Sequence, residues 1–362
     1  MSFRYRYFGA FRLLLSLMVV FQHFTGNAAP PSFTARWEVY EFGSLAVLVF
    51  FCMSGFVIAE AVDMAYRSRP QAFLVNRMLR LAPHLVVANA ITIVLTWIYV
   101  QRGTFHVERF GEQPPPGAFS VANIVGNLLG FIPYSPHLTR YNFIQFTWAL
   151  RTEATFYLVV FVALLVSARW MRGKVEFGVV LSWIFVLMLP GALLSLAGYG
   201  FKTFGFVSYF AFGVGLYFAM KGSWFGGFTA AVSFIILMVR FFQQSPLHSD
   251  LGFHRAVSAQ ACVLVGLLLV MIVLAGLKMD RWRRVDSYLG AITYPIYVYH
   301  FVILVVVTSA FPTYRYRWFV GGIVLSIIFP ALMAEILDPQ INRLRDRVRG
   351  KRLSTSGGVQ LG

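Results

Sequence analysis

The sequence predicts an all-α integral membrane protein, a bundle of about ten transmembrane helices with both termini in the cytoplasm. Of the 362 residues, 58% are hydrophobic and only 12% are charged, whereas soluble domains average about 45–50% apolar and about 25% charged residues. The apolar residues fill whole windows of about 20 residues, the helix length that crosses the hydrocarbon core of a bilayer. The placement of basic residues around these windows predicts the orientation.

About ten apolar segments are long enough to span. In chain order they are residues 7–26, 42–62, 83–101, 146–168, 176–198, 201–220, 224–242, 256–277, 287–309 and 317–338. The sixth is the weakest, because Lys202 and several glycines interrupt it. The first contains Arg12, Gln22 and His23, which a signal peptide would not carry in its apolar region, so we expect a retained helix.

Basic residues predict which ends of the spans face the cytoplasm. Most of the 31 Lys and Arg residues fall in segments that are internal if the N-terminus is inside, including the tail from Arg343 to Arg352. In that count Arg240 belongs to an outer segment. Because Lys and Arg gather in cytoplasmic loops, the net charge of +17 is explained by membrane orientation. It does not indicate nucleic acid as a partner.

The chain is expected to form one membrane domain, residues 1–338, followed by a basic and partly disordered cytoplasmic tail, residues 339–362. The longest stretch outside the spans is residues 102–145, predicted on the outer side, with a short apolar piece from Phe119 to Phe131. That piece is too short to cross and is predicted to be re-entrant or interfacial. Cys52 and Cys262 lie in separate apolar segments, and no spacing typical of metal ligands is present, so no metal site is predicted.

Arg12 and His23 are the first candidates for chemistry, because ionisable residues inside a span are costly. They return to the same helix face about 16 Å apart along the axis. His23 can act as the general base that takes a proton from an attacking hydroxyl. A structural histidine, with Arg12 extending toward the cytoplasm, is an equally good interpretation.

Three further groups are candidates. Arg77 and Arg80, spaced i and i+3, can present two guanidinium groups to a phosphate, although anchoring on the positive inner side is the simpler explanation of such a pair. Glu153, near the outer end of the fourth span, can orient an imidazole or pair with Arg151 or an outer-loop Arg. His300 lies among Tyr294, Tyr297 and Tyr299, which either line a polar cavity or anchor the helix at the interface.

Taken in order, these motifs resemble the acyltransferase 3 family. The resemblance runs from about residue 8 to about residue 305 and rests on motifs of the printed sequence: Arg12…His23, Ser54-Gly55-Phe56, Arg77-Met-Leu-Arg80-Leu-Ala-Pro83, Trp148…Glu153…Phe156-Tyr157 and Tyr294-Pro-Ile-Tyr297…His300. The family consists of membrane acyltransferases that place acetyl or other short acyl groups on glycans, exopolysaccharides and macrolide sugars. Asn76 and Ala149 depart from residues common in the family.

The resemblance implies roles for matching residues. His23 is expected to be catalytic, with Arg12 and Glu153 as its partners. Arg77, Arg80, Ser54 and Gly55 are expected to meet the acyl-CoA. Tyr297, His300 and Trp148 are expected to contact the acceptor.

The expected function is acyl transfer from acyl-CoA, on the cytoplasmic side, to a hydroxyl of a sugar-containing acceptor. No permanently bound cofactor is expected, since the acyl-CoA is a co-substrate. The partners are the acyl-CoA, a carbohydrate or glycosylated small molecule, and the lipid bilayer, and the expected location is a bacterial inner membrane. A secondary transporter or exporter of a glycan or small polar solute is the alternative, because intramembrane His, Arg and Glu also serve proton relays.

Overall fold

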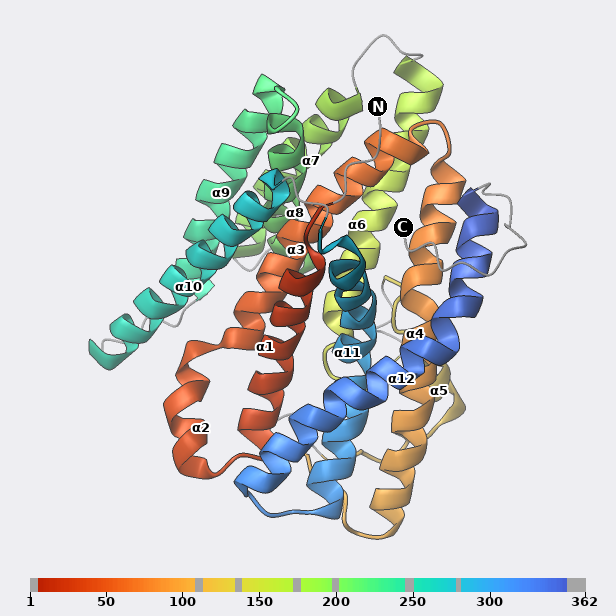
Figure 1. Ribbon diagram of the computed structural model, residues 1–362, viewed down its shortest axis with the longest axis vertical. Helices are drawn as coiled ribbons and strands as arrows, with labels where there is room; N and C mark the ends of the chain where they lie inside the picture. Colours follow the sequence, from red (N-terminus) through yellow and green to blue (C-terminus); the bar gives the residue numbers. More distant parts are fainter. Residues whose placement is uncertain are drawn as a thin grey trace. The chain divides into compact units, whose positions relative to one another are not determined.

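The computed structural model describes residues 6–107, 113–133, 139–171, 177–196, 202–244, 251–277 and 281–349. In this part of the chain the regular structure is entirely helical. The α-helices are α1 (Gly9–Asn27), α2 (Pro31–Trp37), α3 (Phe42–Ala61), α4 (Pro70–Gln101), α5 (Val121–Leu128), α6 (Thr147–Val166), α7 (Phe177–Leu196), α8 (Val207–Ala219), α9 (Trp224–Gln244), α10 (Leu251–Gly276), α11 (Arg283–Ala310) and α12 (Tyr316–Arg349). Shorter 3-10 or π-helical segments are η1 (Glu38–Tyr40), η2 (Val62–Tyr66), η4 (Ser167–Met171) and η5 (Lys202–Phe206). Figure 1 shows these elements.

The all-α membrane fold is confirmed, and one predicted span differs. Among the described residues, 9 helices are long and apolar enough to cross a membrane. The sixth predicted span forms η5 and the 13-residue α8, which is shorter than a full crossing at about 1.5 Å per residue. The orientation of the termini stays a prediction.

Two helices, α4 and α12, extend much further than the predicted spans. α4 begins at Pro70 and contains Pro83 in its interior, whereas the predicted span began at Pro83. Proline is tolerated inside membrane helices because neighbouring groups satisfy the backbone carbonyl that loses its hydrogen bond. α12 continues to Arg349, so the first part of the basic tail is helical. Residues 350–362 lie outside the described residues.

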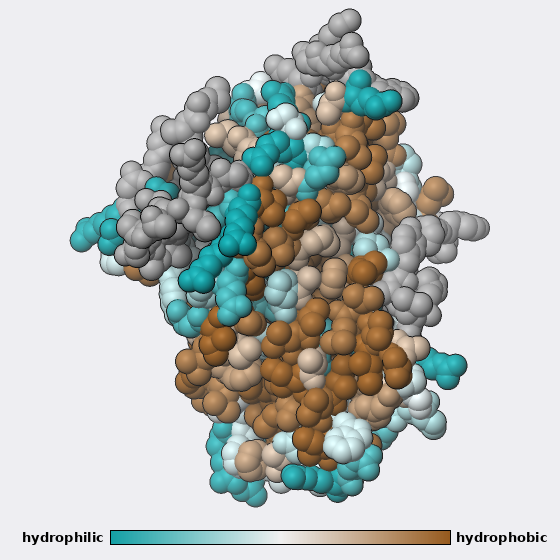
Figure 2. All heavy atoms as spheres, turned by 90° about the vertical axis from the view of Figure 1, so that its right-hand side faces the viewer, coloured by the Kyte–Doolittle hydropathy of each residue, from teal (hydrophilic) through white to brown (hydrophobic). Residues whose placement is uncertain are grey.

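Apolar side chains face outward on the long helices. On α12 the exposed large hydrophobic residues recur along one side of the helix: Val320, Val324, Leu325, Ile328, Leu332 and Ile336. On the face shown in Figure 2, hydrophobic side chains form a broad surface, and hydrophilic side chains gather toward its two ends. A soluble monomer rarely exposes so much contiguous apolar surface, whereas lipid tails solvate it.

The chain divides into two compact units. Unit 1 comprises Met1–Arg4, Val47–Arg77 and Thr155–Met271, and unit 2 comprises Tyr5–Ala46, Met78–Ala154 and Ile272–Gly362. In unit 1, α7, α8 and α9 pack on one another, and in unit 2, α1 and α12 both pack on α11 (Figure 1).

In unit 2, contacts at a constant offset fix the register of α1 against α11. Gly9 N donates to Asp286 Oδ2 (2.9 Å), Ser16 Oγ donates to the Thr293 carbonyl (3.2 Å), and His23 contacts His300, each pair being 277 residues apart in the sequence. On each helix these positions follow at intervals of about two turns, as in a heptad seam. The constant offset means that the helices run parallel, so His23 and His300 lie at the same level.

In unit 1, two glycines bring helices α3 and α8 together. A Cβ at Gly55 would collide with the Phe210 backbone, and one at Gly213 would collide with the Cys52 carbonyl. Small residues allow this backbone approach in membrane bundles, where packing and not water exclusion drives association. At the other end of α8, the hydroxyl of Tyr217 and the ammonium of Lys221 both donate to the Asp63 carboxylate.

Candidate functional site

A pair of histidines lies at the centre of the candidate site in unit 2. His23 Nδ1 on α1 is 2.7 Å from His300 Nε2 on α11, and the two rings stack with centroids 4.9 Å apart. His300 is completely buried, and His23 is half-buried. The sequence predicted both residues for the site, but it did not predict that they bind each other.

The partners of His300 assign the hydrogen atoms of this pair. His300 Nδ1 is 3.2 Å from the Ile296 carbonyl oxygen, and because a carbonyl only accepts, His300 Nδ1 carries a hydrogen. In the neutral ring Nε2 then bears the lone pair and accepts from His23 Nδ1–H. The lone pair of a neutral His23 therefore lies on its Nε2, which is the nitrogen that can take a proton.

Phe146 covers the histidine pair with its ring. Its centroid lies 4.7 Å from that of His300 at an interplanar angle of 15°, and 5.8 Å from that of His23 at 27°. Tyr297 and Phe301 contact Phe146 edge-on. Phe146 therefore covers one side of the histidine pair with an apolar ring.

Two asparagines of α5 hold the segment that leads to Phe146. Asn127 donates to the Tyr141 carbonyl (2.9 Å) and accepts from the Phe143 backbone N–H (3.0 Å). Asn123 donates to the same Tyr141 carbonyl (3.1 Å) and accepts from the backbone N–H of Tyr141 (3.1 Å). Both side chains are buried. The amides replace the sheet or helix partners that this irregular segment lacks, and thereby fix the position from which Phe146 reaches the histidines.

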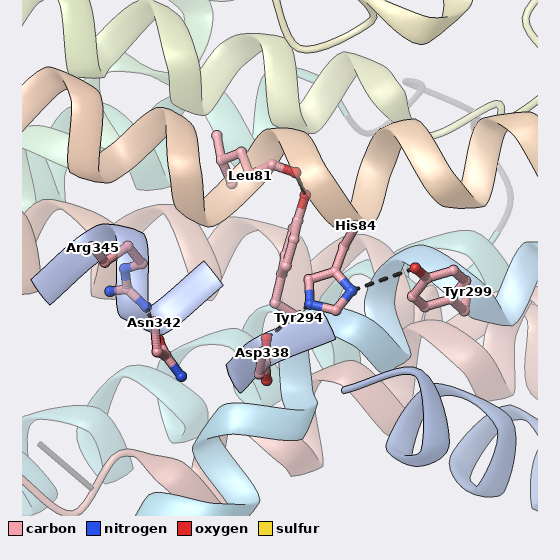
Figure 3. Close-up of polar contacts among 7 residues, drawn as sticks. All are labelled: Leu81, His84, Tyr294, Tyr299, Asp338, Asn342 and Arg345. Carbon is pink, nitrogen blue, oxygen red and sulfur yellow. Dashed lines mark hydrogen bonds and ion pairs between the residues drawn. The ribbon is translucent and has the colours of Figure 1, made fainter. Parts of the chain in front are cut away.

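A second polar cluster joins three helices of unit 2 (Figure 3). His84 on α4 is buried, with Nε2 2.9 Å from Asp338 Oδ1 on α12 and Nδ1 3.4 Å from the Tyr299 hydroxyl on α11. One turn away, the Tyr294 hydroxyl donates to the Leu81 carbonyl (2.6 Å). These bonds hold the part of α4 that carries Arg80 against α11, the helix that also carries His300.

The other predicted residues of unit 2 occupy different surroundings. Arg80 is half-buried and makes no hydrogen bond or ion pair with any residue in the described part of the chain. Tyr297 is buried against Phe146, and the Glu153 carboxylate lies within electrostatic range of the Tyr297 phenol. Trp148 is 40% exposed at the start of α6. The roles of Arg12 and Glu153 as partners of His23 stay predictions.

Arg77, Ser54 and Gly55 lie in unit 1. Arg77 is buried, and its guanidinium lies over the rings of Phe73 and Tyr157, 5.5 and 5.6 Å from their centroids. It is therefore held more rigidly than an arginine that only anchors the helix at the membrane surface. Gly55 packs against the Phe210 backbone, which gives it a structural role, and the predicted contacts of Ser54 and Arg77 with the acyl-CoA stay predictions.

Several residues of the site carried no usable signal in the sequence. Phe146 is one aromatic residue among many at the start of a span, and His84 follows the proline at which the apolar window begins. The spacing of Asn123 and Asn127, i and i+4, places both amides on one face of a helix. That spacing indicates a shared role but does not identify the segment they hold.

The fold and site define a multi-pass membrane protein with an intramembrane histidine pair, a class that includes both transporters and enzymes. The comparison with known families separates the two. Residues 5–335, nearly the whole chain, match the family model described as an acyltransferase domain, so the chain belongs to the acyltransferase 3 family. No curated protein and no solved structure shows significant similarity to it. The protein is thus a membrane acyltransferase, and the transporter alternative is disfavoured.

Proposed function

We propose that this protein transfers an acetyl or other short acyl group from an acyl-CoA to a hydroxyl of a sugar-containing acceptor, with His23 as the base. Family membership supports acyl transfer within the membrane. The donor, the acceptor and the base are the parts that the proposal adds. A bacterial inner membrane, with the donor on the cytoplasmic side, is the proposed setting.

The observation that carries the proposal is the bond from His23 Nδ1 to His300 Nε2, with His300 anchored on the Ile296 carbonyl. A catalytic base needs a fixed tautomer and a neighbour that holds its ring, as the orienting residue does in a catalytic triad. His300 supplies both for His23. The covering ring of Phe146 keeps water from that side of the pair, which strengthens the hydrogen bond.

In the proposed step His23 Nε2 takes the proton of the acceptor hydroxyl. The hydroxyl oxygen attacks the thioester carbonyl carbon, a new C–O ester bond forms, and the C–S bond breaks. The departing thiolate takes the proton from His23 and leaves as CoA–SH, so the base is regenerated. Direct transfer and transfer through an acyl-enzyme use the same base, and isotope exchange between acyl-CoA and free CoA without acceptor would identify the second route.

In the proposal, arginine side chains bind the acyl-CoA and aromatic side chains bind the sugar-containing acceptor. Arg80 has no protein partner in the described part of the chain, and a half-buried guanidinium of this kind suits the phosphates of CoA. Arg12 of the same unit is proposed as a further contact of these phosphates, and the predicted contacts of Arg77, Ser54 and Gly55, in unit 1, with the donor stay predictions. The exposed Trp148 suits a sugar, because aromatic faces stack on pyranose rings, whereas Tyr297 and His300 are buried and their contacts with the acceptor stay predictions.

The test is transfer of labelled acetyl from acetyl-CoA to endogenous glycan in membranes that contain wild type, His23→Ala or His106→Ala. His106 is the matched control, since it is a half-buried histidine that contacts Tyr314 and lies outside the proposed machinery. Label is expected with wild type and with His106→Ala, and none with His23→Ala.

Turnover by a correctly inserted His23→Ala protein would exclude His23 as the base. Label with none of the three proteins would direct the test to purified protein, where binding or slow hydrolysis of acetyl-CoA decides whether a donor site exists. Absence of both would refute the acyl-CoA donor.

A further inference from the structure

A buried arginine lies in unit 1, outside the candidate site. Arg240 on α9 is 3% exposed, although the sequence placed it in an outer segment. Its guanidinium lies over the Phe206 ring, 5.3 Å from the centroid, and directly against Gly205, where any Cβ would collide with it. Packing therefore holds this cation in one place.

The guanidinium lacks a counter-charge in the described part of the chain. Arg240 Nε and NH1 are buried, and neither has a hydrogen-bond partner among the described residues. A buried cation in an apolar span is costly unless it is paired and hydrogen-bonded. A buried guanidinium is normally paired with an anion, so we expect an anion to bind beside Arg240.

Two hydroxyls in the first turn of α8 also lack a partner within the described part of the chain, and one of them, that of Tyr209, lies near Arg240. Ser208 and Tyr209, in the first turn of α8, are completely buried, and neither hydroxyl has a hydrogen-bond partner among the described residues. Tyr209 lies within electrostatic range of Arg240. The N-terminal end of α8 carries the positive end of the helix dipole. Arg240 and Tyr209 thus place a fixed cation and a hydroxyl donor near the N-terminal end of α8, and Ser208 adds a hydroxyl in the same turn that is unpartnered among the described residues.

We propose that Arg240 and Tyr209 bind a phosphoryl group, with Ser208 of the same helical turn as a further donor. Donors on several side chains suit a tetrahedral oxyanion, which offers more acceptor oxygens than a planar carboxylate. Arg240 lies near the end of the span Trp224–Phe242, the depth at which lipid phosphates lie. The phosphoryl group belongs to a lipid headgroup or to a water-soluble phosphate ester, and the site is independent of the function proposed for His23.

The test measures lipid binding to purified protein by native mass spectrometry. Wild type, Arg240→Gln and the control Arg317→Gln, an exposed arginine that lies over Trp318, are titrated in detergent with phosphatidylglycerol or with diacylglycerol, which lacks the phosphate. Wild type and Arg317→Gln are expected to bind phosphatidylglycerol at one site, and Arg240→Gln about tenfold to a hundredfold more weakly. Diacylglycerol is expected to show no such dependence on Arg240.

A parallel titration with inorganic phosphate, read as a rise in the thermal unfolding midpoint, distinguishes the two sources. A rise with phosphate alone, abolished by Arg240→Gln, assigns the site to a water-soluble ester. Equal binding of phosphatidylglycerol and of phosphate by wild type and Arg240→Gln would overturn the proposal. If Arg240→Gln does not fold, Tyr209→Phe, which removes only the hydroxyl, serves in its place and is expected to weaken binding severalfold. Unchanged binding by that variant would overturn the proposal.

Discussion

At the residue scale, the proposed function depends on which nitrogen of His23 carries a hydrogen. The chain from the Ile296 carbonyl through His300 to His23 is continuous in hydrogen bonds. Each link fixes the tautomer of the next ring, so a backbone oxygen on α11 determines the proton-accepting atom on α1. His300 is accordingly a positioning residue for the proposed base, a more specific role than the acceptor contact expected from the sequence.

Replacing His300 by Phe is expected to lower kcat by about a hundredfold to ten-thousandfold. The Phe ring preserves the stacking on Phe146, but it cannot accept from His23 Nδ1–H, so the tautomer is no longer fixed. The KM for acetyl-CoA should change little. Steady-state kinetics with a purified acceptor measure both constants.

His300→Gln provides the rescue, because its side-chain oxygen can accept the hydrogen bond, and it should retain more activity than His300→Phe. Equal kcat for wild type and His300→Phe would contradict the positioning role. A loss shared by both variants together with loss of thermal stability would indicate a packing role only.

The two arginines of the predicted pair differ in their surroundings, and this difference can be tested. Arg80→Gln is expected to raise the KM for acetyl-CoA about tenfold to a hundredfold, because a charged hydrogen bond to phosphate is lost. Arg80→Lys should lose less, since it keeps the charge. Arg36→Gln, an exposed arginine on α2, is the control and should leave KM unchanged. An unchanged KM in Arg80→Gln would remove Arg80 from the donor site.

At the scale of elements, two devices bring the site together. The seam of α1 and α11 sets the level of the histidines through contacts at a constant offset, beginning with the Asp286 carboxylate on the first N–H groups of α1. This carboxylate also complements the positive end of the helix dipole. The second device is the short helix α5, whose asparagines hold the segment that leads to Phe146.

Asn127→Ala is expected to lower the stability of this segment by about 1–3 kcal/mol, because the buried backbone N–H of Phe143 loses its partner, while the Tyr141 carbonyl keeps only the bond from Asn123. Phe146 would then no longer be held over the histidines, and kcat should fall about tenfold to a hundredfold. The thermal midpoint and kcat are measured together. Asn142→Ala, which removes only a contact with Thr139, is the control. Unaltered kcat with a lowered midpoint would separate the role of Asn127 in folding from any role in catalysis.

At the scale of the whole molecule, the number of crossings decides where the termini lie. The structure gives 9 candidate spans in its described part and a shorter apolar helix, Thr203–Ala219. An even number of crossings places both termini on one side, and an odd number places them on opposite sides. If the shorter helix crosses the membrane, both termini lie on the same side, as the basic residues predict. If it does not cross, the termini lie on opposite sides.

Both termini are expected in the cytoplasm, because the basic residues flank the spans asymmetrically. A reporter that fluoresces only in the cytoplasm should be bright when it is fused to the N-terminus and equally bright when it is fused to the C-terminus. Arg102→Cys, at an exposed position after α4, should react with an impermeant maleimide from outside. A dark C-terminal fusion with a bright N-terminal one would show that the shorter helix does not cross.

Most membrane spans could be predicted from the sequence, whereas the contacts within the site could not. Most spans follow from their apolar windows alone, whereas the sixth was indicated as weak by the same criterion, and α8 is indeed short. The start of α4 was not predictable, because the apolar window begins near Pro83 while the helix begins at Pro70. Hydropathy measures which part of a helix lies in lipid, and it carries no information on where the helix begins.

The sequence by itself determined the fold class and the family, because membrane insertion depends on composition and the family is recognised from local motifs. The tertiary structure alone decided the partners. His23 and His300 are 277 residues apart, and only the packing of α1 on α11 makes them a pair. The same holds for His84 with Asp338, and for Arg240 with Tyr209. The physical reason is that a hydrogen bond depends on the separation of two atoms in space, which no local pattern of residues encodes.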